Sequence, residues 1–131
     1  GNNFVKTMIR LGKEKSSLDV IFDQVGTPTY AKDLAQTILK VIPKINNDKI
    51  EIYNYSNEGV LSWYDFAKEI IKMAKLDCKV KPIETYQYPT PAKRPHYSIL
   101  NKSKIKQKFN IEIPYWKDGL DDCLKRLGER K

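Results

Sequence analysis

The stretch from residue 50 to residue 75 reads IEIYNYSNEGVLSWYDFAKEIIKMAK and indicates the fold class. Residues 50–56 are rich in isoleucine and tyrosine and predict a strand, and the Asn-Glu-Gly that follows them predicts a turn. Ser62, followed three residues later by Asp65, is the aspartate variant of a capping box. Apolar residues then recur at helical spacing, so we predict a helix over residues 63–75.

Strand and helix signals alternate along the rest of the chain as well. A chain with about five helices and about three strands is an α/β protein, or an α+β-like fragment, with one small sheet. We expect a single domain over residues 1–131. The further helices are expected over residues 4–13, from Pro28 or Thr29 to Pro43, over 102–109 and after Pro114, and the further strands over 19–23 and 78–85.

The composition narrows the kinds of partner. The formal charge is +8, and residues 93–131 alone carry 11 basic and 5 acidic side chains. A basic surface leaves nucleic acid, an acidic membrane and a small phosphate compound open as partners. No apolar run is long enough to span a bilayer, and we recognise no signal peptide. Two distant cysteines, Cys78 and Cys123, and a single histidine fit a reducing cytoplasm and make a metal site unexpected.

Two segments place polar groups at backbone turns. In GNNFVKTM, Asn3 precedes a predicted helix whose free N–H groups attract anions, and simple helix capping is the alternative interpretation. In DQVGTPT, Gly26 permits close approach of a ligand and Pro28 stiffens the loop. The polar side chains of Gln24 and Thr29 flank that glycine, and a plain turn is the alternative.

The second half holds two clusters of positive charge. Residues 86–98 contain three prolines and no periodicity, which predicts a long loop of the kind that is often functional. Arg94 in this loop carries a planar guanidinium that suits a diphosphate, and a solvated surface arginine is the alternative. The lysines at 102, 104, 106 and 108 do not share one helical face or alternate with aromatic residues, so we interpret them as a solvated helix exterior.

Several motifs of larger enzymes are missing from the sequence. It contains no GxGxxG turn for a dinucleotide, no phosphate-binding P-loop and no GxSxG nucleophile motif. Tyr64 and Lys68 form a YxxxK pair, in which a lysine can lower the pKa of a tyrosine one helical turn away. No cofactor motif precedes this pair, so we interpret both residues as parts of an ordinary amphipathic helix.

Four segments together resemble a known family. GNNFVKTMIRL, DQVGTPTYAKDLA, YSNEGVLSWYDFAKEI and PTPAKRPHYSIL are similar, in order and spacing, to the carboxy-terminal half of the dTDP-4-dehydrorhamnose reductase family. This family belongs to the extended short-chain dehydrogenases. The resemblance implies an amino-terminal Rossmann domain and a smaller substrate domain, and reduction of dTDP-4-dehydro-6-deoxy-L-mannose to dTDP-L-rhamnose by NADPH or NADH. It also implies a role in bacterial cell-surface polysaccharide synthesis.

The resemblance also assigns site residues. The glycine-rich turn and the catalytic tyrosine and lysine of the family precede GNNF, so we expect no catalytic or cofactor-binding residue here, and Tyr64 and Lys68 are not that pair. We therefore expect a substrate-binding part that lacks its Rossmann domain and is inactive alone. The implied substrate-binding residues are Asn3, Phe4, Gln24, Gly26, Pro28, Thr29 and Arg94.

The expected partners follow from the same resemblance. They are a dTDP-sugar, the missing Rossmann domain and a second copy in a homodimer of the full-length enzyme, with neither nucleic acid nor membrane. One alternative is a non-catalytic regulatory homologue, as is known for a subunit of methionine adenosyltransferase. Another is a basic nucleic-acid-binding module, whose binding would fall steeply with salt.

Overall fold

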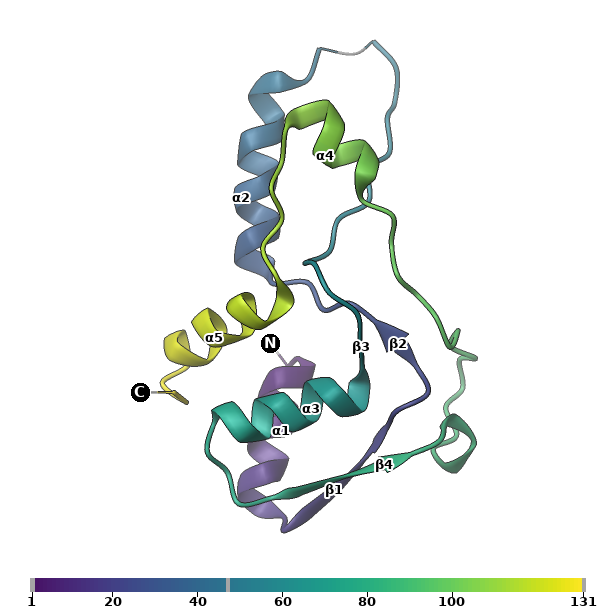
Figure 1. Ribbon diagram of the computed structural model, residues 1–131, viewed down its shortest axis with the longest axis vertical. Coiled ribbons are helices and arrows are strands. Elements are labelled where there is room, and N and C mark those ends of the chain that lie inside the picture. The colour runs from purple at the N-terminus through teal and green to yellow at the C-terminus, as the bar shows by residue number, and fades with distance from the viewer. Residues whose placement is uncertain (1, 47, 131) are drawn as a thin grey trace.

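A computed structural model describes residues 2–46 and 48–130, so Gly1 of the GNNFVKTM motif lies outside it. The five predicted α-helices and the mixed α/β class are confirmed within these residues. Figure 1 shows α2 and α4 at one end of the molecule and the β1–β4 pair at the other. The elements are α1 (Phe4–Glu14), β1 (Ser17–Ile21), β2 (Val25–Gly26), α2 (Ala31–Val41), the 3₁₀ helix η1 (Ile42–Lys44), β3 (Leu61–Ser62), α3 (Trp63–Met73), β4 (Lys79–Ile83), the 3₁₀ helix η2 (Thr85–Gln87), α4 (Ser103–Phe109) and α5 (Trp116–Arg126).

The strands form two small sheets where we expected one sheet of about three strands. β1 pairs in parallel with β4, from Ser17 opposite Lys79 to Ile21 opposite Ile83. β2 pairs with β3 in antiparallel register, with Val25 opposite Ser62. The predicted loop 24–29 therefore contains a short strand, and the helix expected from Pro28 or Thr29 begins only at Ala31.

The predicted strand over residues 50–56 is wrong. Its sequence has the alternation of a strand, since Tyr53 and Tyr55 pack inward while Ile50 and Ile52 are 98% and 77% exposed. Within the described residues, however, no strand lies beside it to complete a hydrogen-bonded ladder. A β-strand needs a second strand to hydrogen-bond with as well as residues of high strand propensity. Residues 50–56 have the propensity but no such strand among the described residues.

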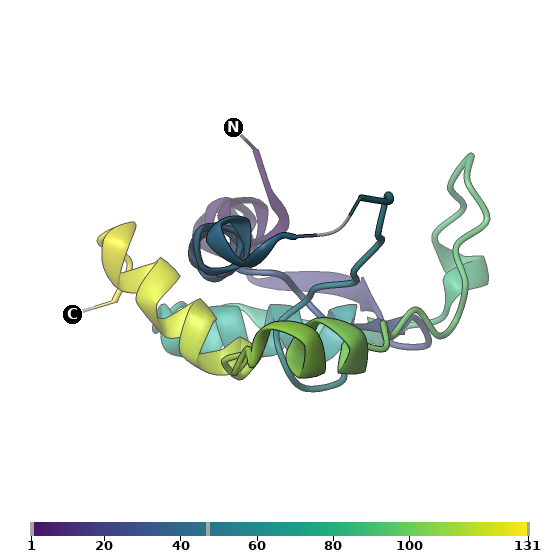
Figure 2. The same ribbon diagram turned by 90° about the horizontal axis from the view of Figure 1, so that it is seen from above.

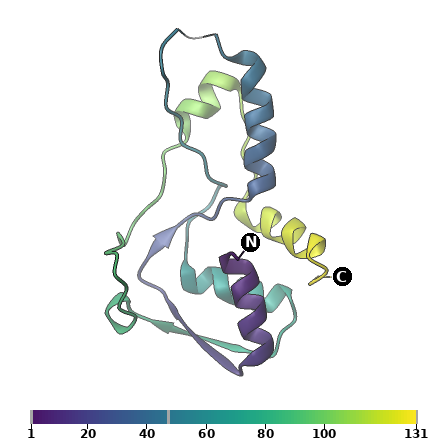
Figure 3. The ribbon, with the colours of Figure 1, turned by 180° about the vertical axis from the view of Figure 1, so that it is seen from behind.

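Two apolar cores hold the fold together. The larger core joins α1, α3, β1 and α5, and it includes Ile70 and Leu124, whose side chains are fully buried. Figure 3 shows α1 crossing over α3 beside the β1–β4 pair. The capping box predicted at Ser62 is present, because the Ser62 and Asp65 side chains each bind the other's backbone N–H. The smaller core lies beneath α4 and contains Ile105, Phe109, Ile111 and Ile113.

None of the helices in residues 2–46 and 48–130 has both the length and the apolar character that crossing a bilayer demands.

Candidate functional site

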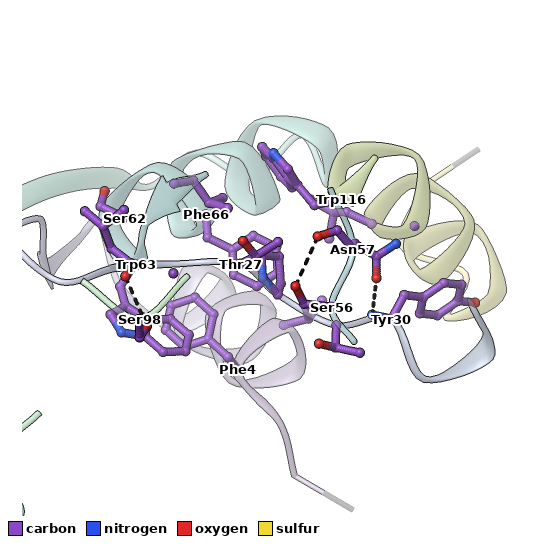
Figure 4. A pocket seen from close by; sticks show the side chains of 18 of the residues that line it. Phe4, Thr27, Tyr30, Ser56, Asn57, Ser62, Trp63, Phe66, Ser98 and Trp116 are labelled. Carbon is purple, nitrogen blue, oxygen red and sulfur yellow. Dashed lines mark hydrogen bonds between the residues drawn. The ribbon is translucent and has the colours of Figure 1, made fainter. Parts of the chain in front are cut away.

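A cleft of about 670 Å³ opens where the start of α1, the β2–β3 pair and the start of α5 meet. Figure 4 shows Phe4, Trp63 and Ser98 at one end of this cleft and Tyr30 and Asn57 at the other. All seven residues implied as substrate contacts line it: Asn3, Phe4, Gln24, Gly26, Pro28, Thr29 and Arg94. The fold thus brings three separate segments of the sequence to one concavity, and their role toward a ligand stays a prediction.

The amino end of α1 supplies one wall of the cleft. Asn3 is the N-cap of α1, because its side-chain oxygen accepts a hydrogen bond of 3.0 Å from the backbone N–H of Lys6. The capping interpretation of Asn3 is therefore confirmed. The Phe4 ring centroid lies 4.8 Å from that of Trp63 and 5.6 Å from that of Phe66. These stacked and tilted rings make the wall aromatic and apolar.

The segment from Gln24 to Thr29 crosses the floor of the cleft. Gln24 is only 5% exposed, and its side-chain amide donates to Thr85 Oγ1 over 3.1 Å. Gly26 lies so close to Ser98 that a Cβ atom would sit 2.9 Å from the Ser98 hydroxyl. This segment is therefore more than a plain turn, because close packing fixes its backbone.

Arg94 approaches the cleft from the long loop that follows η2. Its side chain is exposed and makes no hydrogen bond or ion pair within the described part of the chain. The guanidinium is therefore free to receive an anion in the cleft. A fork of N–H donors of this kind binds phosphate oxygens two at a time.

The sequence analysis missed Asn57, which is fully buried at the end of the cleft. Its side-chain oxygen accepts from the backbone N–H of Tyr30 over 2.8 Å, and its amide donates to Asp33 over 2.6 Å. The Asn-Glu-Gly pattern predicts only a turn, and a turn asparagine is ordinarily exposed. Only the packing of α2 and α5 around this position reveals its role.

Tyr30 was also missed, and it joins the cleft to α5. Its hydroxyl donates to Asp122 Oδ2 over 2.8 Å, and the same carboxylate accepts from Lys32 and from Arg126. Burial and the bond to Asp122 raise the pKa of Tyr30 to about 12. The phenol is therefore protonated at neutral pH, and its hydrogen bond to Asp122 holds the residue before α2 against α5.

The interpretation of the lysine run as a solvated exterior is wrong for Lys102. This side chain is buried, and its Nζ donates to the backbone oxygen of Asn57 over 2.8 Å and pairs with Glu58. Lys106 pairs with the same Glu58, and Lys104 pairs with Glu51 over 2.7 Å. Acidic partners thus neutralise much of the run, which disfavours a nucleic-acid surface along α4.

The YxxxK pair lies away from the cleft. Lys68 Nζ sits 5.6 Å from the centre of the Tyr64 ring, and neither residue lines the cleft. Tyr64 packs against the larger core while Lys68 is exposed, as an amphipathic helix requires. Across residues 2–46 and 48–130, no three His, Cys, Asp or Glu side chains form a group that could hold a metal ion.

Comparison with known proteins gives a consistent match. A family model described as the RmlD substrate binding domain matches residues 1–129. The dTDP-4-dehydrorhamnose reductase of Aggregatibacter actinomycetemcomitans is 42% identical over 129 residues, which cover 92% of this chain and 44% of that protein.

Solved structures agree with this match. A dTDP-4-dehydrorhamnose reductase from Clostridium acetobutylicum is 43% identical with a TM-score of 0.89, over 98% of this chain and 45% of that one. The reductase of Bacillus anthracis, solved in complex with NADP, is 40% identical with a TM-score of 0.86, over 96% of this chain and 43% of that one. The chain therefore spans less than half the length of these relatives.

Proposed function

The chain belongs to the RmlD substrate-binding-domain family, and from this premise we propose that it forms the sugar-nucleotide-binding part of a dTDP-4-dehydrorhamnose reductase. That enzyme reduces dTDP-4-dehydro-6-deoxy-L-mannose to dTDP-L-rhamnose with NADPH or NADH. The observation that carries the proposal is the shared cleft, which is lined both by Arg94, without a partner in the described residues, and by the aromatic rings of Phe4 and Trp63. A nucleotide sugar offers the matching groups, namely a dianionic diphosphate and a flat base.

In this proposal each wall of the cleft has a separate task. Arg94 binds the diphosphate, since it is an exposed cation that lines the cleft and has no partner among the described residues. The rings of Phe4 and Trp63 offer an apolar surface to the base or to the sugar. The rigid segment around Gln24 and Gly26 holds the floor in place, so binding does not have to order it.

We place the dinucleotide and the proton-donating tyrosine on a Rossmann part outside this chain. The residues present do not fit a dinucleotide, because the sequence has no glycine-rich turn to hold its diphosphate. NADPH or NADH supplies the hydride when it is bound to that other part. This chain then presents and orients the sugar nucleotide and is inactive alone.

An exposed apolar face supports docking onto that Rossmann part. The extended segment 50–56 has no strand beside it in the described residues, and Ile50 and Ile52 project from it. A row of unpaired backbone groups beside apolar side chains can add to the edge of another sheet. We assign to the same docking face the exposed isoleucines and the leucine of α2, of η1 and of the residue that follows η1: Ile38, Leu39, Ile42 and Ile45.

We further propose a cytoplasmic enzyme, because the thiols of Cys78 and Cys123 are free and a reducing compartment keeps them so. The homodimer of the full-length enzyme stays a prediction.

The proposal is tested on the assembled reductase, by which we mean this chain together with its Rossmann part. The assembled reductase should oxidise NADPH when dTDP-4-dehydro-6-deoxy-L-mannose is added, and this chain alone should not. A matched chimaera provides a second test, with this chain replacing the aligned portion of the Clostridium acetobutylicum reductase. Oxidation by the isolated chain, or an assembled enzyme with no activity on the keto-sugar, would overturn the proposal.

A further inference from the structure

Both ends of the loop that carries Arg94 are fastened to one residue, Asp23. Where the loop leaves β4, the Asp23 carboxylate accepts hydrogen bonds from the backbone N–H and the hydroxyl of Thr85, over 2.9 and 2.7 Å. Where the loop returns, His96 Nδ1 lies 2.8 Å from the backbone oxygen of Asp23. Figure 2 shows the loop after η2 standing away from the helices, so its position depends on these end contacts.

The hydrogen bond at the returning end does not depend on the charge of His96, whereas the same Nδ1 lies 3.6 Å from the Asp23 carboxylate and pairs with it when the ring is charged. A carbonyl oxygen can only accept, so the hydrogen must be on Nδ1, and both the neutral and the protonated ring can carry it there. The neighbouring backbone completes this anchor, since Val25 N–H donates to the His96 oxygen over 2.8 Å. Ser98 N–H in turn donates to the oxygen of Val25 over 2.9 Å.

The contact at the leaving end reaches the cleft through a relay. The Thr85 hydroxyl donates to Asp23 and accepts from the amide of Gln24, which lines the cleft. Burial raises the pKa of Asp23, but the bonds from Thr85 outweigh it and hold that pKa below its usual value. The carboxylate is therefore ionised at neutral pH and able to accept both Thr85 hydrogen bonds.

Between the two anchors the loop has little else to hold it. Thr90 donates to the oxygen of Ala92 within the loop, and Arg94 has no partner in the described residues. A loop free at its base would have to be ordered by the ligand, and that ordering opposes binding. A loop closed at its base keeps the guanidinium near the cleft before the ligand arrives.

We infer that Asp23, Thr85 and His96 form a clasp that positions Arg94 for the diphosphate of a sugar nucleotide. This inference rests on the proposed function. None of the three clasp residues lines the cleft, so none of them contacts the ligand directly. They are positioning residues, and their loss should weaken ligand binding while leaving the chemical step unchanged.

Thr85 offers the sharpest test, in the assembled reductase. Thr85→Val keeps the shape of the side chain but removes the hydroxyl, whereas Thr85→Ser keeps the hydroxyl. We expect Thr85→Val to raise the KM for the dTDP-sugar by about 3- to 10-fold, with kcat and the KM for NADPH unchanged, since only substrate binding is weakened. Thr85→Ser should restore the KM. Thr90→Val is the matched control, because its hydroxyl bonds only within the loop, and it should leave the KM unchanged.

A double-mutant cycle shows whether the clasp acts through Arg94. In an Arg94→Ala background, Thr85→Val should cause no further rise in KM, because the guanidinium that it positions is gone. Full and independent effects of the two substitutions would overturn the inference. If Arg94→Ala raises the KM and Thr85→Val does not, the clasp is refuted while the proposed function stands. An assembled enzyme without keto-sugar reduction would refute the proposed function instead.

Amide hydrogen exchange on this chain tests the clasp without any activity. Residues 88–95 should exchange faster in Thr85→Val than in Thr85→Ser or in the unaltered chain. Equal exchange in all three proteins would overturn the inference.

Discussion

The side-chain amide of Asn57 lies 2.6 Å from the carboxylate of Asp33, so a fully buried group is bonded directly to the first turn of α2. The same side chain accepts from the backbone of Tyr30 and donates to the oxygen of Pro114, just before α5. One asparagine thus ties together two helices whose first residues border the cleft. Its contacts are made at a distance in the sequence, with groups of Tyr30, Asp33 and Pro114.

Replacing Asn57 should destabilise the chain. Asn57→Ala removes the hydrogen bonds to Tyr30, Asp33 and Pro114, and we expect a loss of roughly 1–3 kcal/mol in the free energy of unfolding. Asn57→Asp keeps the shape but sets a second carboxylate beside Asp33, so its penalty should be larger at neutral pH than in acid. Urea unfolding at the two pH values measures both effects. A penalty for Asn57→Asp that does not change with pH would contradict the contact with Asp33.

Gly59 should tolerate no side chain, for two physical reasons. Its φ of +104° is in the region that favours glycine, and a Cβ atom there would lie 2.4 Å from the Trp116 ring. Gly128 is a matched control, because it has a φ of +71° but open space around the Cβ position. We expect Gly128→Ala to cost about 1 kcal/mol and Gly59→Ala clearly more, since overpacking adds about 1–3 kcal/mol. Thermal unfolding of the two variants compares them, and equal losses would rule out the clash with Trp116.

The elements that the sequence predicts well are those fixed by neighbours along the chain. The helix starting at Phe4 and the helix starting at Trp63 begin where predicted, because each follows an N-cap and an apolar period that are both local. The Arg94 loop was likewise expected, since its prolines are visible in the sequence.

The elements that the sequence predicts poorly depend on distant partners. The segment 50–56 has strand propensity but no strand beside it in the described residues. Lys102 looks like any surface lysine until Glu58 and the backbone of Asn57 are found beneath it. The seven residues that the resemblance implies as substrate contacts could be named from the sequence, and they line the cleft. Asn57 and Tyr30 could not, because their partners are distant in the sequence and are seen only in the folded structure.

Tyr30 gives an alkaline limit to stability. Because its pKa is raised from 10.0 to about 12 in the folded chain, its contribution is complete below pH 10 and is lost as the pH rises through about 12. Tyr30→Phe removes the bond to Asp122 but keeps the ring. We expect the stability difference between the unaltered chain and Tyr30→Phe to be constant up to about pH 10 and to shrink above it. Urea unfolding across this range checks the prediction, and a difference that stays constant to pH 12 would contradict it.

The docking face should control assembly. Ile50→Lys together with Ile52→Lys places charges on exposed apolar positions, so this chain should self-associate less while its own stability changes little. The assembled reductase should lose activity, because buried lysines would oppose contact with the Rossmann part. Light scattering and NADPH oxidation measure the two effects. Val60→Lys is the control, as a valine that is 57% exposed outside the docking face, and an equal loss of activity from it would remove the special role of residues 50–56.

Arg94 and Lys104 are both exposed cations, but only Arg94 lines the cleft, so Lys104 is a suitable control for the effect of removing a positive charge. Lys104 pairs with Glu51 and sits over the Tyr53 ring, whereas Arg94 has no partner in the described residues and lines the cleft. We expect Arg94→Ala to raise the KM for the dTDP-sugar roughly 10- to 100-fold, the equivalent of about 1.5–3 kcal/mol for hydrogen bonds to a charged group. Lys104→Ala should leave that KM unchanged, because its charge is already neutralised and lies away from the cleft.

A further variant, Arg94→Lys, keeps the positive charge at this position but loses the planar guanidinium with its fork of N–H donors. If two-point binding of phosphate oxygens is the source of affinity, Arg94→Lys should recover only part of the loss. Full recovery would mean that charge alone suffices, since a lysine binds as a point charge. Raising the salt concentration separates the two cases, because a pure charge effect at the cleft rim is screened while a fork bonded to the diphosphate is screened less. Equal KM values for Arg94→Ala and Lys104→Ala would remove Arg94 from the site.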